Sequence, residues 1–347
     1  MRIALIIGTR PEIIKCAPII QRLHSSDLLI HTNQHYSPAM DADFFREFDL
    51  RLPDYNLNVG SGSHAEQIAA ILAGSNNVLA KQKPDWVLVQ GDTNSSLGGA
   101  LAASKAGLPV AHIEAGLRSG DRSMPEEINR IMIDHISEAL FTPTEIQTRF
   151  LRNEGIPSEK IFEVGNTIAD TIEIQLKGER IDGTEDSVED DGFALLTLHR
   201  PENIHNKESL SFLIAQINDL AEELPVRFSV HPGTQKKFLQ NRLELHPNIQ
   251  WLIPQPYLRF LKMLRKATVV LTDSGGVQEE ACILNTPCVT LRTTTERQET
   301  LKTGMNRLMS NNLKADVQKA MNKTSNGPSP YQPGATEKIL STIGHLQ

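Results

Sequence analysis

Cysteine is scarce in this sequence, and long hydrophobic runs are absent. The three cysteines, at positions 16, 282 and 288, show no metal-ligand spacing, and their odd number fits a reducing compartment. No stretch approaches the ~18 consecutive apolar residues of a membrane span. The N-terminal residues run from a short apolar stretch directly into Gly-Thr-Arg without a cleavage pattern, unlike a signal peptide. These absences predict a cytoplasmic protein without membrane insertion.

Basic residues are outnumbered by acidic ones. Lys and Arg number 35 against 42 Asp and Glu, which gives a net charge of −7 and a pI near 5.9. Binding to a nucleic-acid backbone needs a basic surface, so nucleic acid is not expected as the main partner. A small phosphorylated ligand stays open as a partner, because it needs only a local positive pocket.

Short apolar runs recur along the chain and are separated by helix-length segments. Near-continuous apolar strands that alternate with helices predict parallel sheets covered on both faces. A chain of 347 residues is too long for one compact hydrophobic core. We therefore predict an α/β fold of two doubly wound domains. The expected strands are Ile3–Ile7, Trp86–Val89, Val110–Ile113, Ala139–Phe141, Ile161–Val164, Phe193–Leu198, Arg227–Val230, Ile249–Ile253, Thr268–Leu271 and Cys288–Leu291.

An acidic stretch marks the expected domain boundary. Residues 182–191 hold six acids and no base, which is typical of a solvated linker. We expect an N-terminal domain over residues 1–175 and a C-terminal domain over residues 190–330. A polar stretch, Asn322–Pro333, then precedes a last helix at Ala335–Ile343.

One turn has the composition of an anion site. Asp273–Glu280 follows the run Ala267–Leu271 and leads into a helix-compatible segment. Its glycines let a phosphate come close, while free N–H groups at a helix start point at the charge. We therefore predict phosphate at Ser274, Gly275 and Gly276, and sugar hydroxyls at Glu280. An ordinary strand-to-helix turn is the alternative, since such turns often use Gly and Ser without a ligand.

Further polar clusters follow the strands, where open α/β sheets gather their ligands. Gly8–Lys15 follows the first strand and places two cations, Arg10 and Lys15, near a helix start. The cations oppose the helix dipole, which is tolerated more readily where an anion binds between them. A surface arginine and a solvated lysine are the alternative.

Three carboxylates are candidates for acid–base chemistry. Asp92 follows the strand at Trp86–Val89, and Glu114 stands at a strand exit where packing explains an acid poorly. Glu126 belongs to a Pro-Glu-Glu helix start, so a dipole-stabilising role competes with a catalytic one. Asp92 is equally compatible with an N-cap. If the three lie close together, they would supply the carboxylates of proton transfer.

The second half offers cations and a histidine at strand ends. His199 and Arg200 close the first strand of the second domain, and Arg292 begins a polar loop after the last clear strand. His199 is placed to titrate near neutral pH or to hydrogen-bond a ligand. His199, His231 and His246 lack close ligand spacing, so we predict no metal site.

Taken together, these segments resemble the non-hydrolysing UDP-N-acetylglucosamine 2-epimerases. The resemblance implies a GT-B-type fold of two Rossmann-like domains, with the active site in the interdomain cleft and residues 331–347 packed back on the first domain. It also implies a homodimer, a role in polysaccharide biosynthesis and no cofactor. The matching motifs occur in the family's order and cover most of the chain: Gly8–Lys15, Gln90–Thr93, His112–Arg118, Pro125–Arg130, His199–Arg200, Asp273–Glu280 and Thr294–Glu299.

The reaction implied by the resemblance interconverts UDP-N-acetylglucosamine and UDP-N-acetylmannosamine. UDP is eliminated to leave 2-acetamidoglucal and then re-adds, while the C2 proton leaves one face and returns to the other. The residues implied as catalytic are Asp92, Glu114, Glu126, His199 and Lys15. Those implied to bind UDP and sugar are Arg10, Lys15, His199, Arg200, Ser274, Gly275, Gly276, Glu280 and Arg292.

Alternatives stay open from the sequence. A 2-epimerase of a UDP-2,3-diacetamido-2,3-dideoxy-glucuronate would use the same motifs, with Arg118, Arg122 and Arg130 as candidates to bind the sugar carboxylate. A hydrolysing epimerase is disfavoured by the intact Gly8–Lys15 segment. A GT-B glycosyltransferase would need an acceptor groove, often with basic or aromatic flanks, and the aromatic content is 5%.

Activation by a second UDP-sugar is not favoured. In many bacterial relatives that second site uses basic residues after a Gln-His motif and after the His-Arg pair. Here Tyr36 follows Gln34-His35, Gly60–Glu66 contains no arginine, and Pro201 follows Arg200.

Overall fold

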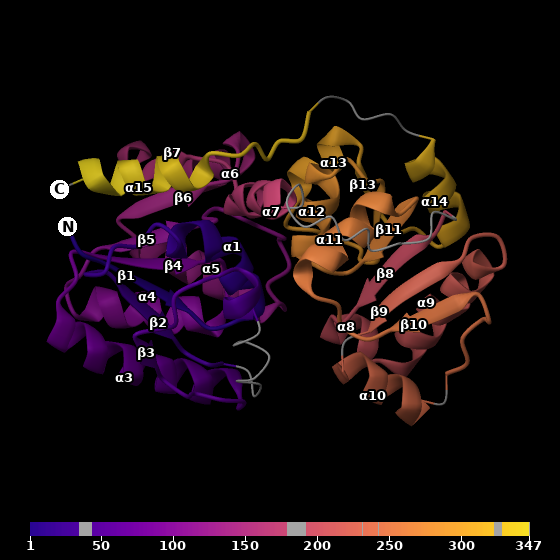
Figure 1. Ribbon diagram of the computed structural model, residues 1–347, viewed down its shortest axis with the longest axis horizontal. Coiled ribbons are helices and arrows are strands. Elements are labelled where there is room, and N and C mark those ends of the chain that lie inside the picture. Colours follow the sequence, from indigo (N-terminus) through magenta and orange to yellow (C-terminus); the bar gives the residue numbers. More distant parts are fainter. Residues whose placement is uncertain (35–43, 179–191, 231, 242, 323–327, 347) are drawn as a thin grey trace. The chain divides into compact units, whose positions relative to one another are not determined.

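The computed structural model describes residues 1–34, 44–178, 192–230, 232–241, 243–322 and 328–346. The predicted linker at 182–191 lies outside the described residues, as do His35, Tyr36 and His231. The chain divides into two compact units, one of Met1–Ile174 with Tyr331–Gln347 and the other of Gln175–Pro330 (Figure 1).

The first unit is a seven-stranded parallel sheet with the strand order β3-β2-β1-β4-β5-β6-β7. Its strands are β1 Ile3–Ile7, β2 Leu28–His31, β3 Tyr55–Asn56, β4 Trp86–Gln90, β5 Val110–Ile113, β6 Ala139–Thr142 and β7 Ile161–Glu163. Its helices include α1 Arg10–Ile20, α3 His64–Gln82, α4 Asn94–Lys105, α5 Pro125–Ile136, α6 Glu145–Asn153, the short 3-10 helix Ser158–Lys160, α7 Thr167–Gly178 and α15 Ala335–His345.

The second unit repeats this plan with a six-stranded parallel sheet, ordered β10-β9-β8-β11-β12-β13. Its strands are β8 Ala194–Leu198, β9 Val226–Val230, β10 Ile249–Leu252, β11 Val269–Thr272, β12 Cys288–Thr290 and β13 Asn306–Leu308. Its helices include α8 Pro201–Ile204, α9 Lys207–Ala221, α10 Pro232–Asn241, α11 Tyr257–Lys266, α12 Gly275–Ile283, α13 Gln298–Thr303 and α14 Leu313–Met321.

The predicted α/β fold of doubly wound parallel sheets is confirmed. Alternate residues of β8 pack into different cores: Ala194 and Leu196 join one apolar cluster, and Leu195 joins another. Helices therefore bury both faces of the sheet, and this is why its strands read as continuous apolar runs. Each predicted strand is present to within about two residues at its ends.

Three strands were not predicted. β3 has two residues that are not buried and β13 has one apolar residue among three, so neither shows a strand pattern of its own. β2, Leu28–His31, is fully buried and as long as β5 and β6, so its apolar run was visible in the sequence and was overlooked. β2 matters most, since it pairs with β1 beside the first loop.

Each strand order contains a point where the chain reverses direction across the sheet. β1 lies between β2 and β4 in the first unit, and β8 lies between β9 and β11 in the second. The loops that leave β1 and β4, and those that leave β8 and β11, therefore diverge at the carboxyl edge. Open α/β sheets bind ligands in the crevice that forms there.

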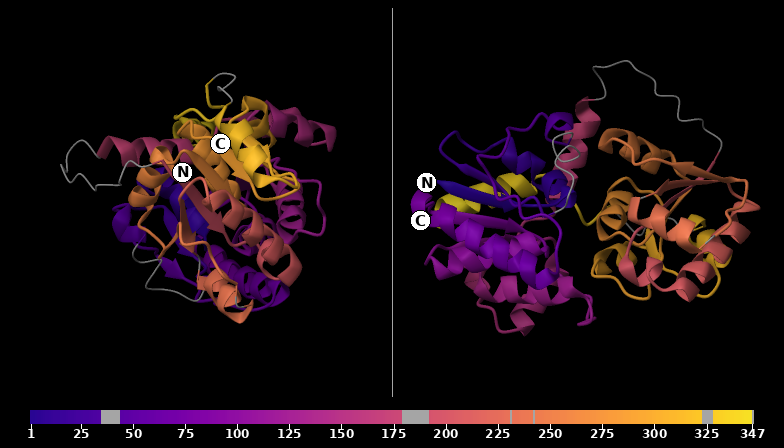
Figure 2. Two further views of the ribbon diagram at one scale, coloured as in Figure 1. Left: turned by 90° about the vertical axis from the view of Figure 1, so that its right-hand side faces the viewer. Right: turned by 90° about the horizontal axis from the view of Figure 1, so that it is seen from below.

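The last helix belongs to the first unit. The backbone N–H groups of Gly334 and Thr336 both donate to Asp170 in α7, the second at 2.7 Å. α15 also contacts α1, and Figure 2 shows it, in yellow, among the elements of the first unit. Among the described residues, no helix has the length and apolar character of a membrane span.

Candidate active site

A buried ion pair lies at the carboxyl edge of the first sheet. Lys15 Nζ in α1 is 2.7 and 2.8 Å from the two carboxylate oxygens of Glu114, which follows β5. The two side chains are 7% and 4% exposed, and the Gln90 amide also donates to Glu114. The alternative of a solvated Lys15 is therefore wrong. Removing either partner would leave an uncompensated buried charge.

Glu114 also has an unusual backbone. Its φ is 70°, in the left-handed region that residues other than glycine rarely adopt. The next residue is fixed to the sheet, because Ala115 N donates to Phe141 O at 3.0 Å. Strain of this kind costs about 1–3 kcal/mol and clusters at functional sites. The geometry therefore supports a functional carboxylate at this strand exit.

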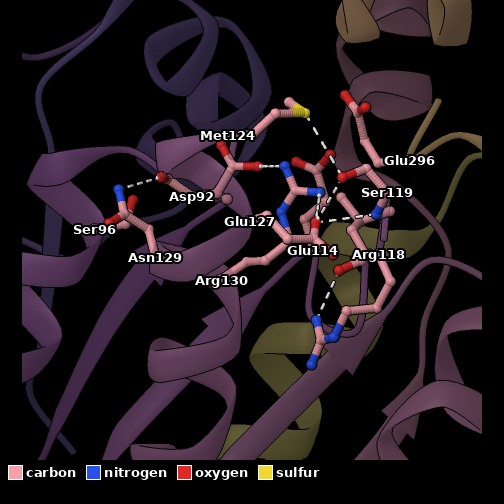
Figure 3. Close-up of polar contacts among 12 residues, drawn as sticks. Asp92, Ser96, Glu114, Arg118, Ser119, Met124, Glu127, Asn129, Arg130 and Glu296 are labelled. Atoms are coloured by element: carbon pink, nitrogen blue, oxygen red, sulfur yellow. Dashed lines mark hydrogen bonds and ion pairs between the residues drawn. The ribbon is translucent and has the colours of Figure 1, made fainter. Parts of the chain in front are cut away.

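Asp92 follows β4 and pairs with an arginine from α5. Its carboxylate is 2.5 Å from Arg130 Nη2, and its backbone carbonyl accepts from Asn129 Nδ2 at 2.9 Å (Figure 3). The side chain stays 24% exposed. Thr93, not Asp92, is the N-cap of α4, so the capping alternative for Asp92 is wrong.

The two glutamates that open α5 differ in their surroundings. Glu127 is buried, pairs with Arg130 at 2.9 Å and accepts from the N–H groups of Ser119 and Gly120. It therefore fixes the preceding loop to the helix. Glu126 is half-buried in the first turn of α5. Asp92 and Glu114 lie on neighbouring loops, since a Cβ added to Gly91 would be 3.8 Å from Glu114 Oε2.

A buried histidine supports the Gly91–Asp92 turn. His112 Nδ1 is 2.7 Å from Asp134 Oδ1, and Nε2 is 2.8 Å from Gly91 O. Both ring nitrogens thus face oxygen atoms, which hold the ring between α5 and the Gly91–Asp92 turn. Burial would raise the pKa of Asp134, but His112 and Arg118 hold it below its usual value. Neither the partner of His112 nor its role was predicted from sequence.

Two of the arginines considered for a sugar carboxylate already have carboxylate partners. Arg118 is 2.7 Å from Asp134 and 2.6 Å from Glu154, and Arg130 holds Asp92 and Glu127. Their charges are compensated within the first unit. Arg122, by contrast, is exposed.

Arg10 lies at the start of α1, directly after the N-cap Thr9. Its guanidinium carbon is 5.3 Å from the centroid of the Phe44 ring, a cation–π contact that restrains the side chain without neutralising it. Phe44 was not predicted, because nothing in the sequence places it beside the first loop.

In the second unit, a buried aspartate organises the turn that carries His199. Asp273, which follows β11, accepts from the backbone N–H groups of His199 and Arg200 at 3.0 and 2.9 Å and from Asn203 Nδ2 at 3.0 Å. His199 Nδ1 is 3.1 Å from the same carboxylate, while its ring stays 42% exposed. Burial would raise the pKa of Asp273, but these hydrogen bonds hold it below its usual value.

The predicted anion turn forms the start of α12. Ser274 is the N-cap, and Gly275 and Gly276 open the helix with N–H groups that have no partner within the helix. A Cβ added to Gly275 would lie 2.7 Å from Glu296 Oε1, so any larger residue would require the Glu296 carboxylate to move. Glu296 in turn is 3.0 Å from Arg292 and 3.7 Å from Arg200. Arg292 and Arg200 thus lie around one buried carboxylate beside the turn.

Glu280 is buried one turn into α12, where Tyr257 Oη donates to its Oε1 at 2.9 Å. Tyr257 begins α11, and its contact with Glu280 was not predicted. Neither Tyr257 nor Glu296 gives a sequence signal of its role, because each acts through a contact distant in sequence. No group of three or more potential metal ligands occurs among the described residues.

Comparison with known proteins decides the family. The family model for UDP-N-acetylglucosamine 2-epimerase matches residues 21–344. The chain belongs to the UDP-N-acetylglucosamine 2-epimerase family. It is 49% identical to the UDP-N-acetylglucosamine 2-epimerase of Methanocaldococcus jannaschii, with 99% of each chain covered. The crystal structure of the enzyme from that organism in complex with UDP-GlcNAc and UDP matches with a TM-score of 0.92 at 47% identity over 100% of both chains.

Two less similar proteins bear on the alternative substrate and on the glycosyltransferase alternative. The UDP-2,3-diacetamido-2,3-dideoxy-D-glucuronate 2-epimerase of Pseudomonas aeruginosa is 40% identical over 89% of this epimerase-family chain and 88% of its own. A glycosyltransferase of kitacinnamycin, 14% identical with a TM-score of 0.56 over 99% of this chain and 94% of its own, is similar in fold alone. The GT-B-type fold is thus shared with glycosyltransferases, while the sequence belongs with the epimerases.

Proposed function

We propose that this chain is an isomerase that interconverts UDP-N-acetylglucosamine and UDP-N-acetylmannosamine by elimination and re-addition of UDP. The observation that carries the proposal is the Lys15–Glu114 pair beside Asp92 at the carboxyl edge of the first sheet. Glu114 and Asp92 supply carboxylates that can remove and return the proton at C2 of the sugar. A relative with a UDP-GlcNAc complex, similar over the whole chain, supports the same substrate.

The second unit supplies the groups that receive UDP. The diphosphate lies at Ser274, Gly275 and Gly276, where N–H groups and a helix dipole favour negative charge. Arg200, Arg292 and His199 add charge and donors as the leaving group becomes negative. Arg10 contributes from the first unit. Glu280, held by Tyr257, accepts from the ribose hydroxyls.

The first unit supplies the groups that move the proton. No carbonyl adjoins C2, so direct removal of its proton is unfavourable, and loss of UDP from C1 makes the proton removal part of an elimination. Glu114 takes the proton from one face, and Asp92 or Glu126 returns one to the other face. Lys15 donates to both oxygens of the Glu114 carboxylate and so fixes its position for this step.

A 2-epimerase acting on the corresponding 3-acetamido uronate is the second candidate, because a relative of that name is 40% identical. Such a substrate adds a carboxylate at C6. Arg118 and Arg130 already neutralise carboxylates of the chain itself, which leaves the exposed Arg122 as the candidate to meet it. This charge balance favours the uncharged N-acetylglucosamine.

We further propose that the chain works in the cytoplasm as a homodimer and that its product serves polysaccharide biosynthesis. Free cysteines that are all buried fit a reducing compartment. Light scattering of the purified chain tests the dimer, which requires twice the mass of 38.5 kDa. A single monomer mass at micromolar concentration would contradict it.

A substrate panel tests the reaction. The purified chain is incubated with UDP-N-acetylglucosamine, UDP-N-acetylmannosamine and the diacetamido uronate, and products are separated by chromatography and identified by NMR. We expect the first two to reach the same mixture from either side, without free sugar. Conversion of the uronate alone would replace the proposal by the second candidate, and release of free N-acetylmannosamine would replace it by the hydrolysing reaction.

A further inference from the structure

Glu12, in the first turn of α1, is a buried carboxyl group that the proposed reaction does not use. Its side chain is 1% exposed. One oxygen, Oε2, accepts from Gly8 N at 2.9 Å, Thr9 N at 2.7 Å and Thr9 Oγ1 at 2.8 Å. The other, Oε1, is 2.7 Å from Thr93 Oγ1 and 2.9 Å from Ser96 Oγ. Each of these contacts is to an amide or hydroxyl group rather than to a cation.

The contacts of Oε1 require one more proton than the hydroxyls supply. Ser96 Oγ lies 2.5 Å from Gln90 O, and a carbonyl only accepts, so the Ser96 hydroxyl donates its hydrogen to Gln90. Thr93 then donates to Glu12, but the 2.9 Å contact between Ser96 and Glu12 has no proton. A proton on Glu12 Oε1 completes the Ser96–Glu12 hydrogen bond, because Glu12 then donates to Ser96. Only the longer Thr93–Ser96 contact, at 3.1 Å, is left without one.

We infer that Glu12 is a neutral carboxylic acid in the folded chain. It is a positioning residue that ties the Gly8–Arg10 turn to the start of α4 without adding negative charge there. Burial, the largest effect, raises the pKa of Glu12 above its usual value, and the hydrogen bonds that Glu12 accepts lower it less. A buried carboxylate without a cationic partner is costly, which favours the neutral form.

The neutral state matters for the anion site and deepens the proposed function, on which this consequence rests. Arg10 precedes Glu12 by two residues and Lys15 follows by three, and both are assigned to the UDP-sugar. A negative charge between them would weaken their attraction for phosphate. Among the described residues, the charged groups of this edge also include Asp92 with its partner Arg130, and Glu114 with its partner Lys15. The Cys16 thiol, whose pKa burial raises, adds no charge.

The sign of the pH dependence follows from the raised pKa. The folded chain binds the Glu12 proton more tightly than the unfolded chain does. Its contribution to stability is therefore complete below the unfolded pKa and is lost as pH rises through the folded pKa. Ionisation in the same pH range would weaken UDP binding.

A second capping box supplies a matched control. Ser63 N and Ser63 Oγ donate to Glu66 Oε2 at 2.9 and 2.8 Å, close to the Thr9–Glu12 geometry, but Glu66 is exposed. The hydrogen bonds from Ser63 lower the pKa of Glu66. Glu66→Gln thus removes an ionised carboxylate from a position that is otherwise equivalent in its helix.

Difference infrared spectroscopy reads the two protonation states directly. At neutral pH, wild type minus Glu12→Gln should show the carbonyl stretch of a carboxylic acid, which shifts in D₂O, whereas wild type minus Glu66→Gln should show a carboxylate band. A carboxylate band lost in Glu12→Gln would overturn the inference. The spectra need no substrate, so they decide the state of Glu12 even if the proposed function fails.

UDP titrations test the consequence. Glu12→Gln keeps an acceptor for Gly8 and Thr9 and donates to Thr93 and Ser96, so its UDP affinity at pH 7 should stay within about threefold of wild type, while Glu12→Ala should lose more than about tenfold. As pH rises, wild type should lose affinity relative to Glu12→Gln. Loss in Glu12→Gln equal to that in Glu12→Ala, with wild-type melting behaviour, would contradict the neutral role. If wild type binds no UDP, the proposed function fails.

Discussion

At the scale of single residues, the charges of the first unit are arranged in pairs. Lys15 holds Glu114, Arg130 holds Asp92 and Glu127, and Arg118 holds Asp134. These pairs fix the side chains with charge-assisted hydrogen bonds, which are roughly twice as strong as neutral ones. A carboxylate that must reach one hydrogen atom of a sugar benefits from being fixed in this way.

Glu114→Gln tests the proton-transfer role. Exchange of the substrate C2 hydrogen with solvent should fall by at least about 100-fold, because the amide cannot take the proton. UDP binding should change by less than about threefold, since the groups assigned to the diphosphate at Ser274, Gly275 and Gly276 are not altered. Glu145→Gln, which alters an exposed carboxylate on α6, serves as the control and should leave exchange unchanged. Equal loss of UDP binding would make Glu114 structural.

Tyr257→Phe tests the assignment of Glu280 to the ribose. Without the 2.9 Å hydrogen bond, Glu280 is held less firmly, and UDP affinity measured by calorimetry should fall by about five- to tenfold. Inorganic pyrophosphate has no ribose, so it should bind the variant as it binds wild type. An equal loss for both ligands would show that Tyr257 supports the turn as a whole.

At the scale of elements, the strand-to-helix junction after β1 is closely packed. A Cβ added to Gly8 would lie 2.0 Å from Thr32 Oγ1 and 2.0 Å from Ser95 Oγ. These two hydroxyls are themselves 2.6 Å apart, so β1, β2 and α4 meet at this glycine. This close packing fixes the position of the loop that follows β1.

Gly8→Ala should lower the free energy of unfolding by about 1–3 kcal/mol, because the added methyl group forces its neighbours apart. Gly344→Ala is the matched control. It lies in α15 with nothing within 4 Å of an added Cβ, and should stabilise the chain by up to about 1 kcal/mol through helix propensity. Urea unfolding measures both. A neutral Gly8→Ala would contradict the packing described for this junction.

The elements themselves show what sequence can predict. Long apolar runs such as β1 and β4 are buried along their whole length, and this burial is what the sequence pattern reports. β3 and β13 were missed because their few residues show no apolar pattern, whereas the buried apolar run of β2 was overlooked. Among site residues, those beside strand ends were predicted from position. Tyr257, Phe44, Glu296 and Asp134 were not, because only the folded chain brings them to their partners.

At the scale of the whole molecule, each unit contains a buried aspartate whose pKa is lowered in the folded chain. Asp134 serves the first unit and Asp273 the second, and in each case burial is outweighed by donors around the carboxylate. Because the folded pKa lies below the unfolded one, the stability that each contributes is complete above the unfolded pKa and is lost as pH falls through the folded pKa.

Acid unfolding tests this dependence. The wild-type free energy of unfolding should fall as pH drops from about 5 towards the folded pKa of these groups. Asp273→Asn, although less stable at pH 7, should lose less over the same range, because the asparagine does not titrate. Urea titrations at several pH values measure both slopes. Parallel slopes for wild type and variant would show that Asp273 has no lowered pKa.

In the proposed reaction the chain eliminates UDP while it removes the proton at C2. The most direct measurement is a proton NMR time course of UDP-N-acetylglucosamine with the purified chain in D₂O. We expect the C2 proton signal to disappear, deuterium to be found at C2 of both epimers, and Glu114→Gln to stop this exchange. Conversion to the manno epimer with the original hydrogen kept at C2, or no exchange at all, would contradict it.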